Sequence, residues 1–201
     1  MKPIYKFLNI NNHQEISNEV YQYIVDHTQV LLLENPFVLK DIGQMLNYCP
    51  LLNDFLNIYK LIPKKLAIIL VFPKNSENSM HKDLDGADPY VRILWPVRNC
   101  QGSITKLWQV PDDAGTLINT NGIVYTAFPW DQPREQIDEF ELSHPVLFNA
   151  SCAHSVHPAP ESTQTRISFT IGFDRDLPIS KSIEAWSELG FFNQGDGHET
   201  R

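Results

Sequence analysis

The sequence predicts a mainly β protein, a sandwich, barrel or jelly roll that carries helices from its N-terminal part on one face. Three observations support this prediction. From residue 65 onward, short apolar or alternating runs follow one another, each bounded by Pro, Gly, Asn or Asp, as is typical of strands. No helical pattern separates them, which argues against a parallel βαβ sheet. The chain has 201 residues, 42% of them hydrophobic, which is enough to bury a core.

The individual elements follow from the spacing of apolar residues. Apolar residues recur at helical spacing in four segments, approximately residues 15–25, 38–48, 51–59 and 180–190. Seven runs are expected to be strands: LAIILVF (66–72), YVRILWPV (90–97), SITKLWQV (103–110), GIVYTAF (122–128), EQIDEFEL (135–142), PVLFNA (145–150) and TRISFTIGF (165–173). The segment 112–134 is expected to form a loop over one end of the sandwich.

The net charge and the cysteines indicate which binding partners and which cellular compartment are expected for the protein. Sixteen basic and 24 acidic residues give a net charge of −8, which argues against nucleic acid or an anionic membrane as the main partner. The longest strictly apolar run, residues 66–72, is far shorter than the roughly 20 residues that span a bilayer. The N-terminus has no secretory signal pattern, and Cys49, Cys100 and Cys152 lack zinc or redox spacing. We therefore expect a soluble cytoplasmic protein; the sequence leaves its oligomeric state open.

Two of the seven histidines are followed two positions later by a carboxylate. In an extended segment, residues i and i+2 share a face, so both side chains can bind one metal ion. His13 and Glu15 lie at the start of the first expected helix, where residues at this spacing point apart. His81 and Asp83 follow a strand and a polar loop, in the irregular region where sandwiches commonly place their sites. The sequence therefore indicates His81 and Asp83 as candidate metal ligands.

The last expected strand has one apolar and one polar face. Its polar face carries Arg166, Ser168 and Thr170, whereas every residue of the other face is apolar, namely Ile167, Phe169, Ile171 and Phe173. We expect the apolar face to pack against the helices. The polar face either meets water or lines the interior and binds an anion; a carboxylate would suit the guanidinium fork.

Together these motifs resemble the Fe(II)/2-oxoglutarate-dependent dioxygenases, whose core is a double-stranded β-helix (jelly roll). The family pattern is His-x-Asp, a distal His and then Arg-x-Ser. It matches His81-Lys82-Asp83, His154 of HSVHPAP, and Arg166-Ile167-Ser168, in that order and within residues 66–173. His157 is the alternative distal histidine. In a strand it would face away from His154, which we favour because it directly follows the strand VLFNA.

The resemblance implies a chemistry for each residue. His81, Asp83 and His154 would form the catalytic Fe(II) site, and Arg166 with Ser168 would bind the far carboxylate of the cosubstrate 2-oxoglutarate. O2 would occupy the last position on the iron. The implied activity is oxidation of a small-molecule or peptide substrate, coupled to decarboxylation of 2-oxoglutarate to succinate. The carboxylate of Asp83 favours hydroxylation or desaturation, because related halogenases have a small residue there.

The length of 201 residues predicts a single domain over residues 1–201. Residues 1–60 would form a helical support, residues 61–175 the jelly-roll catalytic core, and residues 176–201 a C-terminal helix and tail. In the segment 112–134, Tyr125 and Trp130 are candidates for contact with the substrate. Two alternatives remain open: a cupin-like metal enzyme that does not use 2-oxoglutarate, and a non-catalytic jelly-roll binding module.

Overall fold

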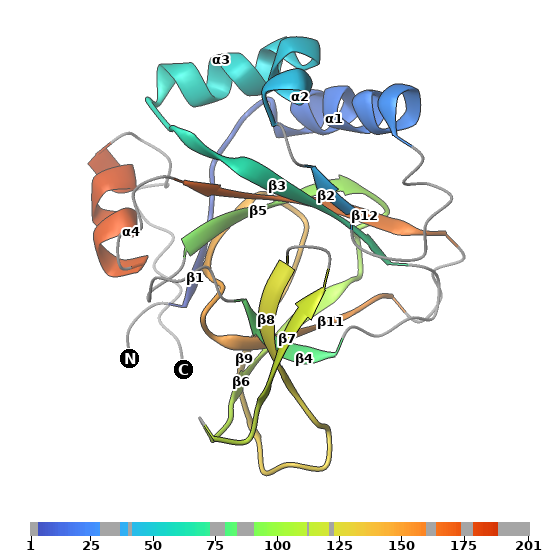
Figure 1. The fold of residues 1–201 in the computed structure, drawn as a ribbon. Coiled ribbons are helices and arrows are strands. Elements are labelled where there is room, and N and C mark those ends of the chain that lie inside the picture. Colours follow the sequence, from blue (N-terminus) through green and yellow to red (C-terminus); the bar gives the residue numbers. More distant parts are fainter. Residues whose placement is uncertain are drawn as a thin grey trace.

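Two six-stranded antiparallel sheets face each other in the computed structural model, and helices cover the outer face of one of them (Figure 1). The structure describes residues 4–28, 37–39, 42–72, 79–83, 91–111, 113–120, 123–159, 164–173 and 179–188. Within these ranges, no helix is both long and apolar enough to cross a membrane.

The first sheet contains the strands that pack against the helices. Its order is β1 (Tyr5–Phe7), β10 (Val146–Asn149), β5 (Val91–Arg98), β12 (Arg166–Phe173), β3 (Pro63–Phe72) and β2 (Phe37–Leu39). The order of the second sheet is β7 (Thr116–Thr120), β8 (Ile123–Phe128), β4 (Met80–Asp83), β11 (Ala153–His157), β6 (Ile104–Gln109) and β9 (Glu135–Glu141).

The chain alternates between the two sheets. It crosses from one sheet to the other at every step from β3 to β6, and again at every step from β9 to β12. This winding is that of a double-stranded β-helix, so the jelly-roll core expected from the sequence is confirmed. All seven expected strands are present. The division of the chain into support, core and tail stays a prediction.

The helices form where apolar spacing predicts them, with one correction. Helices α1 (His13–His27), α2 (Ile42–Tyr48) and α3 (Pro50–Ile58) lie over the first sheet, and α4 (Ile179–Glu188) lies beside one end of it (Figure 1). The expected helix over residues 38–48 is wrong at its start: residues 37–39 form an edge strand that pairs with β3, and the helix begins only at Ile42. The hydrogen bonds of that pairing override the local helical spacing.

Five short strands have no counterpart among the runs expected from the sequence, namely β1, β2, β4, β7 and β11. Each contains only three to five residues, too few to show a clear alternation. Two of them correct specific expectations. His81 and Asp83 lie in strand β4 and not in an irregular region. The expected loop over residues 112–134 contains β7 and β8, which pair with each other as a hairpin.

Strand β12 is central to the first sheet, and all eight of its residues are buried. The four residues of its apolar face belong to a single core cluster with apolar residues of α1, α2 and α3. Burying one such side chain stabilises the fold by roughly 1.5–3 kcal/mol. The helices therefore cover this face, as predicted, and the polar face of β12 must point between the sheets.

A buried serine links α1 to the first sheet. The hydroxyl of Ser17 lies 2.6 Å from the carbonyl oxygen of Pro96 and 2.8 Å from that of His13, and it can donate its one proton to either. It also accepts a hydrogen bond from Nε1 of Trp95 over 3.1 Å. Pro96 has no N–H for the ladder, and the pairing of β5 with β12 shifts register beside it. Ser17 thus satisfies two polar groups where the sheet is irregular.

We expect Ser17→Ala to lower the free energy of unfolding by about 1–3 kcal/mol, because it leaves a buried N–H and a carbonyl without their partner. Denaturant unfolding of the metal-free protein measures this change. Ser187→Ala is the matched control, since Ser187 lies exposed on α4 and only bonds back to the Ile183 carbonyl. Equal stability of the two variants would contradict the linking role of Ser17.

Candidate metal centre and anion site

Strands β4 and β11 bring together residues that are distant in the sequence. His81 and Asp83 share one face of β4, and His81 lies directly opposite His154 in the pairing of β4 with β11. The backbone N–H of Asp83 also donates to the carbonyl of Ala150 over 2.9 Å. As a result, one possible ligand atom of each of the three side chains lies within 4.8 Å of the others.

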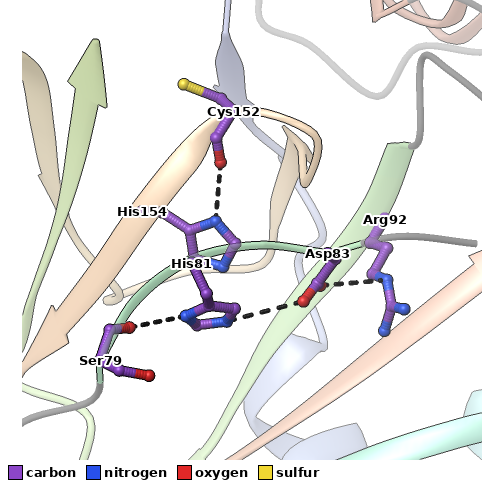
Figure 2. Close-up of polar contacts among 6 residues, drawn as sticks. All are labelled: Ser79, His81, Asp83, Arg92, Cys152 and His154. Carbon is purple, nitrogen blue, oxygen red and sulfur yellow. Dashed lines mark hydrogen bonds and ion pairs between the residues drawn. The ribbon is translucent and has the colours of Figure 1, made fainter. Parts of the chain in front are cut away.

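Both imidazoles are oriented by hydrogen bonds to the backbone (Figure 2). Nδ1 of His81 lies 2.7 Å from the carbonyl oxygen of Ser79, and Nδ1 of His154 lies 2.8 Å from that of Cys152. A carbonyl oxygen can only accept, so each Nδ1 carries the proton and each Nε2 keeps its lone pair. This tautomer is the one that a ligating histidine adopts when its other nitrogen is bonded to the backbone.

The carboxylate of Asp83 lies between a histidine and an arginine. Its Oδ1 is 3.6 Å from Nε2 of His81, and its Oδ2 is 3.5 Å from Nε of Arg92 (Figure 2). Burial by itself would raise the pKa of Asp83, but the charge of Arg92, with additional effects of His154 and His81, lowers it below its usual value. The side chain is therefore an anion at neutral pH, as a metal ligand must be.

His154 is held in its neutral form. Burial, together with the neighbouring His81, lowers the pKa of His154 to about 4, although Asp83 acts in the opposite direction. A neutral imidazole offers a lone pair without first losing a proton. The three side chains thus present two imidazole nitrogens and one carboxylate oxygen, the donor types that a divalent transition metal binds.

The three residues line a cavity of about 270 Å³ between the two sheets. This volume is close to the lower end of ligand pockets, roughly 300–1,000 Å³. Apolar side chains contribute part of the wall, namely Ile68, Leu70, Leu94, Phe148 and Val156. The polar groups of the lining, besides the three candidate ligands, are Ser79, Arg92, Thr105, Tyr125, Arg166 and Thr170. The cavity therefore suits a small ligand with anionic groups.

Arg166 is the most unusual polar residue of the cavity. It is only 1% exposed, and none of its three guanidinium nitrogens has a hydrogen-bond partner among the described residues. Its guanidinium carbon lies 5.0 Å from the centre of the Phe72 ring. Burial lowers the pKa of Arg166, while the nearby Cys100 opposes this effect. A buried guanidinium without a hydrogen-bonding anion is costly, so this end of the cavity fits a carboxylate.

Buried hydroxyl groups accompany this arginine. The Oγ atoms of Thr105, Ser168 and Thr170 are buried and have no hydrogen-bond partner in the part of the chain that the structure describes. Thr105 and Thr170 line the cavity, whereas Ser168 lies on the same face of β12 without belonging to the lining. The structure thus adds Thr105 to the polar groups that line the cavity.

The structure also shows where the other residues singled out in the sequence lie, namely the alternative histidine and the two candidate substrate contacts. His157 lies apart from His81 and Asp83: its Nε2 is 2.8 Å from Oγ of Ser155, and its ring lies beside Trp130. Trp130 does not line the cavity. Tyr125 does line it, with its ring 5.7 Å from that of His81, but it projects from strand β8 and not from a loop.

Arg92 is the functional candidate that the sequence analysis missed. It lies in the run VRILWPV, whose seven side chains are all buried. Because both faces of this strand are covered, the residues do not alternate and no polar face is apparent. The available signal was the charge itself, since an arginine inside an apolar strand requires a buried partner.

Comparisons with known proteins support the fold. No protein-family model and no curated protein matches the chain. The crystal structure of AviO1 from Streptomyces viridochromogenes Tue57 has a TM-score of 0.51 and 10% identity, covering 87% of this chain and 91% of that chain. The apo structure of the non-heme monooxygenase ThoJ has a TM-score of 0.50 and 13% identity, covering 86% and 72%.

A further crystal structure, of the epimerase SnoN in complex with Fe3+, alpha ketoglutarate and nogalamycin RO, has a TM-score of 0.49 and 14% identity, covering 84% of this chain and 78% of that chain. The likeness to AviO1 and ThoJ shows a shared fold. The chain therefore shares its fold with these two proteins, in agreement with the architecture that the motif resemblance implies.

We expect His154→Ala to abolish tight binding of Mn(II), a redox-inert substitute for Fe(II), because it removes one of the three converging ligand atoms. His157→Ala is the matched control and should bind Mn(II) as the parent does. Equilibrium titration followed by the signal of free Mn(II) in electron paramagnetic resonance measures both. The reverse result would show that the metal is held by the other face of β11.

Proposed function

We propose that this protein is an Fe(II)- and 2-oxoglutarate-dependent oxygenase that hydroxylates a small-molecule or peptide substrate. The observation that carries the proposal is the placement of two complementary groups in one cavity. His81, Asp83 and His154 converge at one position, and the buried guanidinium of Arg166, without a hydrogen-bonding anion, lines the same space.

The three converging side chains fit Fe(II). Two imidazoles and one carboxylate are the donor set of non-haem iron oxygenases, and they leave coordination positions open. His81 and His154 would bind through Nε2, because their Nδ1 atoms are occupied by backbone carbonyls. Asp83 would supply the negative charge. Once bound, the iron would supply the activation of O2 that no side chain can provide.

The rest of the cavity fits 2-oxoglutarate. This diacid needs one end at the metal and a cation for its other carboxylate, and Arg166 offers five N–H donors for that carboxylate. Hydroxyls of Thr105 and Thr170 would offer further hydrogen bonds elsewhere along the cavity, and Ser168 would support the arginine from the same strand. Apolar walls such as Leu70 and Val156 would exclude water around the chain of the cosubstrate.

The carboxylate at position 83 supports hydroxylation, because halogenation of the kind known in this superfamily needs a small residue in its place. The net charge of −8 disfavours a nucleic-acid substrate. We propose that the protein acts in the cytoplasm, which its unpaired cysteines support.

Anaerobic addition of Fe(II) and 2-oxoglutarate tests the proposal. We expect the metal-to-ligand charge-transfer band that the oxygenase family shows, and its absence in Asp83→Ala, which lacks a ligand. Succinate formation in air would then report turnover. Tight metal binding without any effect of 2-oxoglutarate would instead indicate a cupin-like metal enzyme. Failure to bind metal would indicate a non-catalytic binding module.

We expect Arg166→Met to weaken 2-oxoglutarate binding about a hundredfold or more. The variant removes two hydrogen bonds to a charged group, each contributing roughly 1.5–3 kcal/mol, and about 1.4 kcal/mol corresponds to a factor of ten. Ser168→Ala should cost roughly tenfold or less, because it removes one neutral hydroxyl. Titration of the charge-transfer band measures both. An unchanged affinity in Arg166→Met would remove the arginine from the cosubstrate site.

A further inference from the structure

Arg92 connects the two sheets across the cavity. It projects from β5 in the first sheet, is 7% exposed, and places its Nε 3.5 Å from Oδ2 of Asp83 on β4 in the second sheet (Figure 2). Its neighbour on β12 in the register is Gly172, which has no side chain to fill the space beside the arginine. The guanidinium thus lies directly behind the carboxylate, on the side away from His81.

The two oxygen atoms of Asp83 face different groups. Oδ1 lies 3.6 Å from Nε2 of His81, whereas Oδ2 lies beside Arg92. The backbone of Asp83 is fixed separately, by its hydrogen bond to Ala150. This main-chain bond fixes where Asp83 lies but not how its carboxylate is turned, and the charged group beside Oδ2 is Arg92.

We infer that Arg92 is a positioning residue that holds Oδ2 of Asp83 and thereby presents Oδ1, alone, toward His81 and His154. The inference rests on the proposed function, since it concerns the carboxylate that would bind the metal. A carboxylate that offers one oxygen contributes one ligand atom, which preserves the open coordination positions that the cosubstrate and O2 would need.

Two other roles for Arg92 predict different results. If it only tied the sheets together, replacing it would change stability and leave metal binding intact. If it acted only through its charge, its removal would tighten metal binding, because a cation beside the site repels a divalent ion. Positioning predicts the opposite sign: loss of a group that orients a ligating carboxylate typically weakens metal affinity by 10–100-fold.

The test is an Mn(II) titration of the full-length protein, followed by electron paramagnetic resonance. Arg92→Met keeps much of the side-chain volume without the charged fork, and we expect roughly 10–100-fold weaker binding and an altered spectrum of bound Mn(II). Arg92→Lys should lie between the parent and Arg92→Met, since an ammonium retains the charge but not the fork geometry. The inference would be overturned if Arg92→Met bound Mn(II) as tightly as the parent does, or more tightly. It would also be overturned if Arg92→Lys had the same Mn(II) affinity as the parent.

Arg98→Met is the matched control. Arg98 lies six residues further along the same strand, is exposed, and stacks on the Tyr21 ring with 4.9 Å between the guanidinium carbon and the ring centre. We expect parental Mn(II) affinity in this variant. If Arg92→Met does not fold, the affinity and spectrum of Arg92→Lys decide the question.

The experiment separates this inference from the proposed function. A parent protein that binds no Mn(II) would contradict the proposed function itself. A parent that binds Mn(II) and responds to 2-oxoglutarate, together with an Arg92→Met variant that binds identically, would leave the function standing and remove only the positioning role.

Discussion

Strand β12 is buried on both of its faces, and the two faces require different partners. Its apolar face is covered by the helices of the N-terminal part, which supply an equally apolar surface. Its other face carries an arginine and two hydroxyls, which cannot be buried against hydrocarbon without large cost. The second sheet therefore does not close tightly over this face. A cavity with polar lining remains between the sheets, and β12 determines where it lies.

Two arginines line the cavity at positions far apart along the neighbouring strands β5 and β12. Arg92 is opposite Gly172 in the register, and Gly172 lies six residues beyond Arg166 on β12. At about 3.4 Å per residue, the backbone positions are roughly 20 Å apart along the strand. One guanidinium meets Asp83, whereas the other meets no carboxylate among the described residues. The positive charge that has no neighbouring carboxylate is therefore that of Arg166, and a bound anion is expected at that end of the cavity.

The sequence was most informative where patterns are long. The alternation of residues 165–173 predicted the helix-covered face of β12 and left its polar face either in water or in the interior, where the structure places it. The His-x-Asp spacing located two of the three converging residues. Short elements escaped this reasoning: three residues at 37–39 pair with β3 against their helical spacing, and β4 is too short to alternate visibly. Arg92 was missed because a strand covered on both sides shows no periodicity, and its partner lies in the other sheet. The roles of the candidate residues in binding metal and cosubstrate stay predictions.

Each of the two imidazoles at the cavity is oriented by the backbone carbonyl two residues earlier, which lies just before the strand that carries the histidine. Their orientation therefore depends on main-chain atoms, which every amino acid possesses. Substitution of the preceding residues, Ser79 and Cys152, retains those carbonyls as long as the backbone path is kept. The orientation of the two rings is therefore independent of which side chains occupy positions 79 and 152.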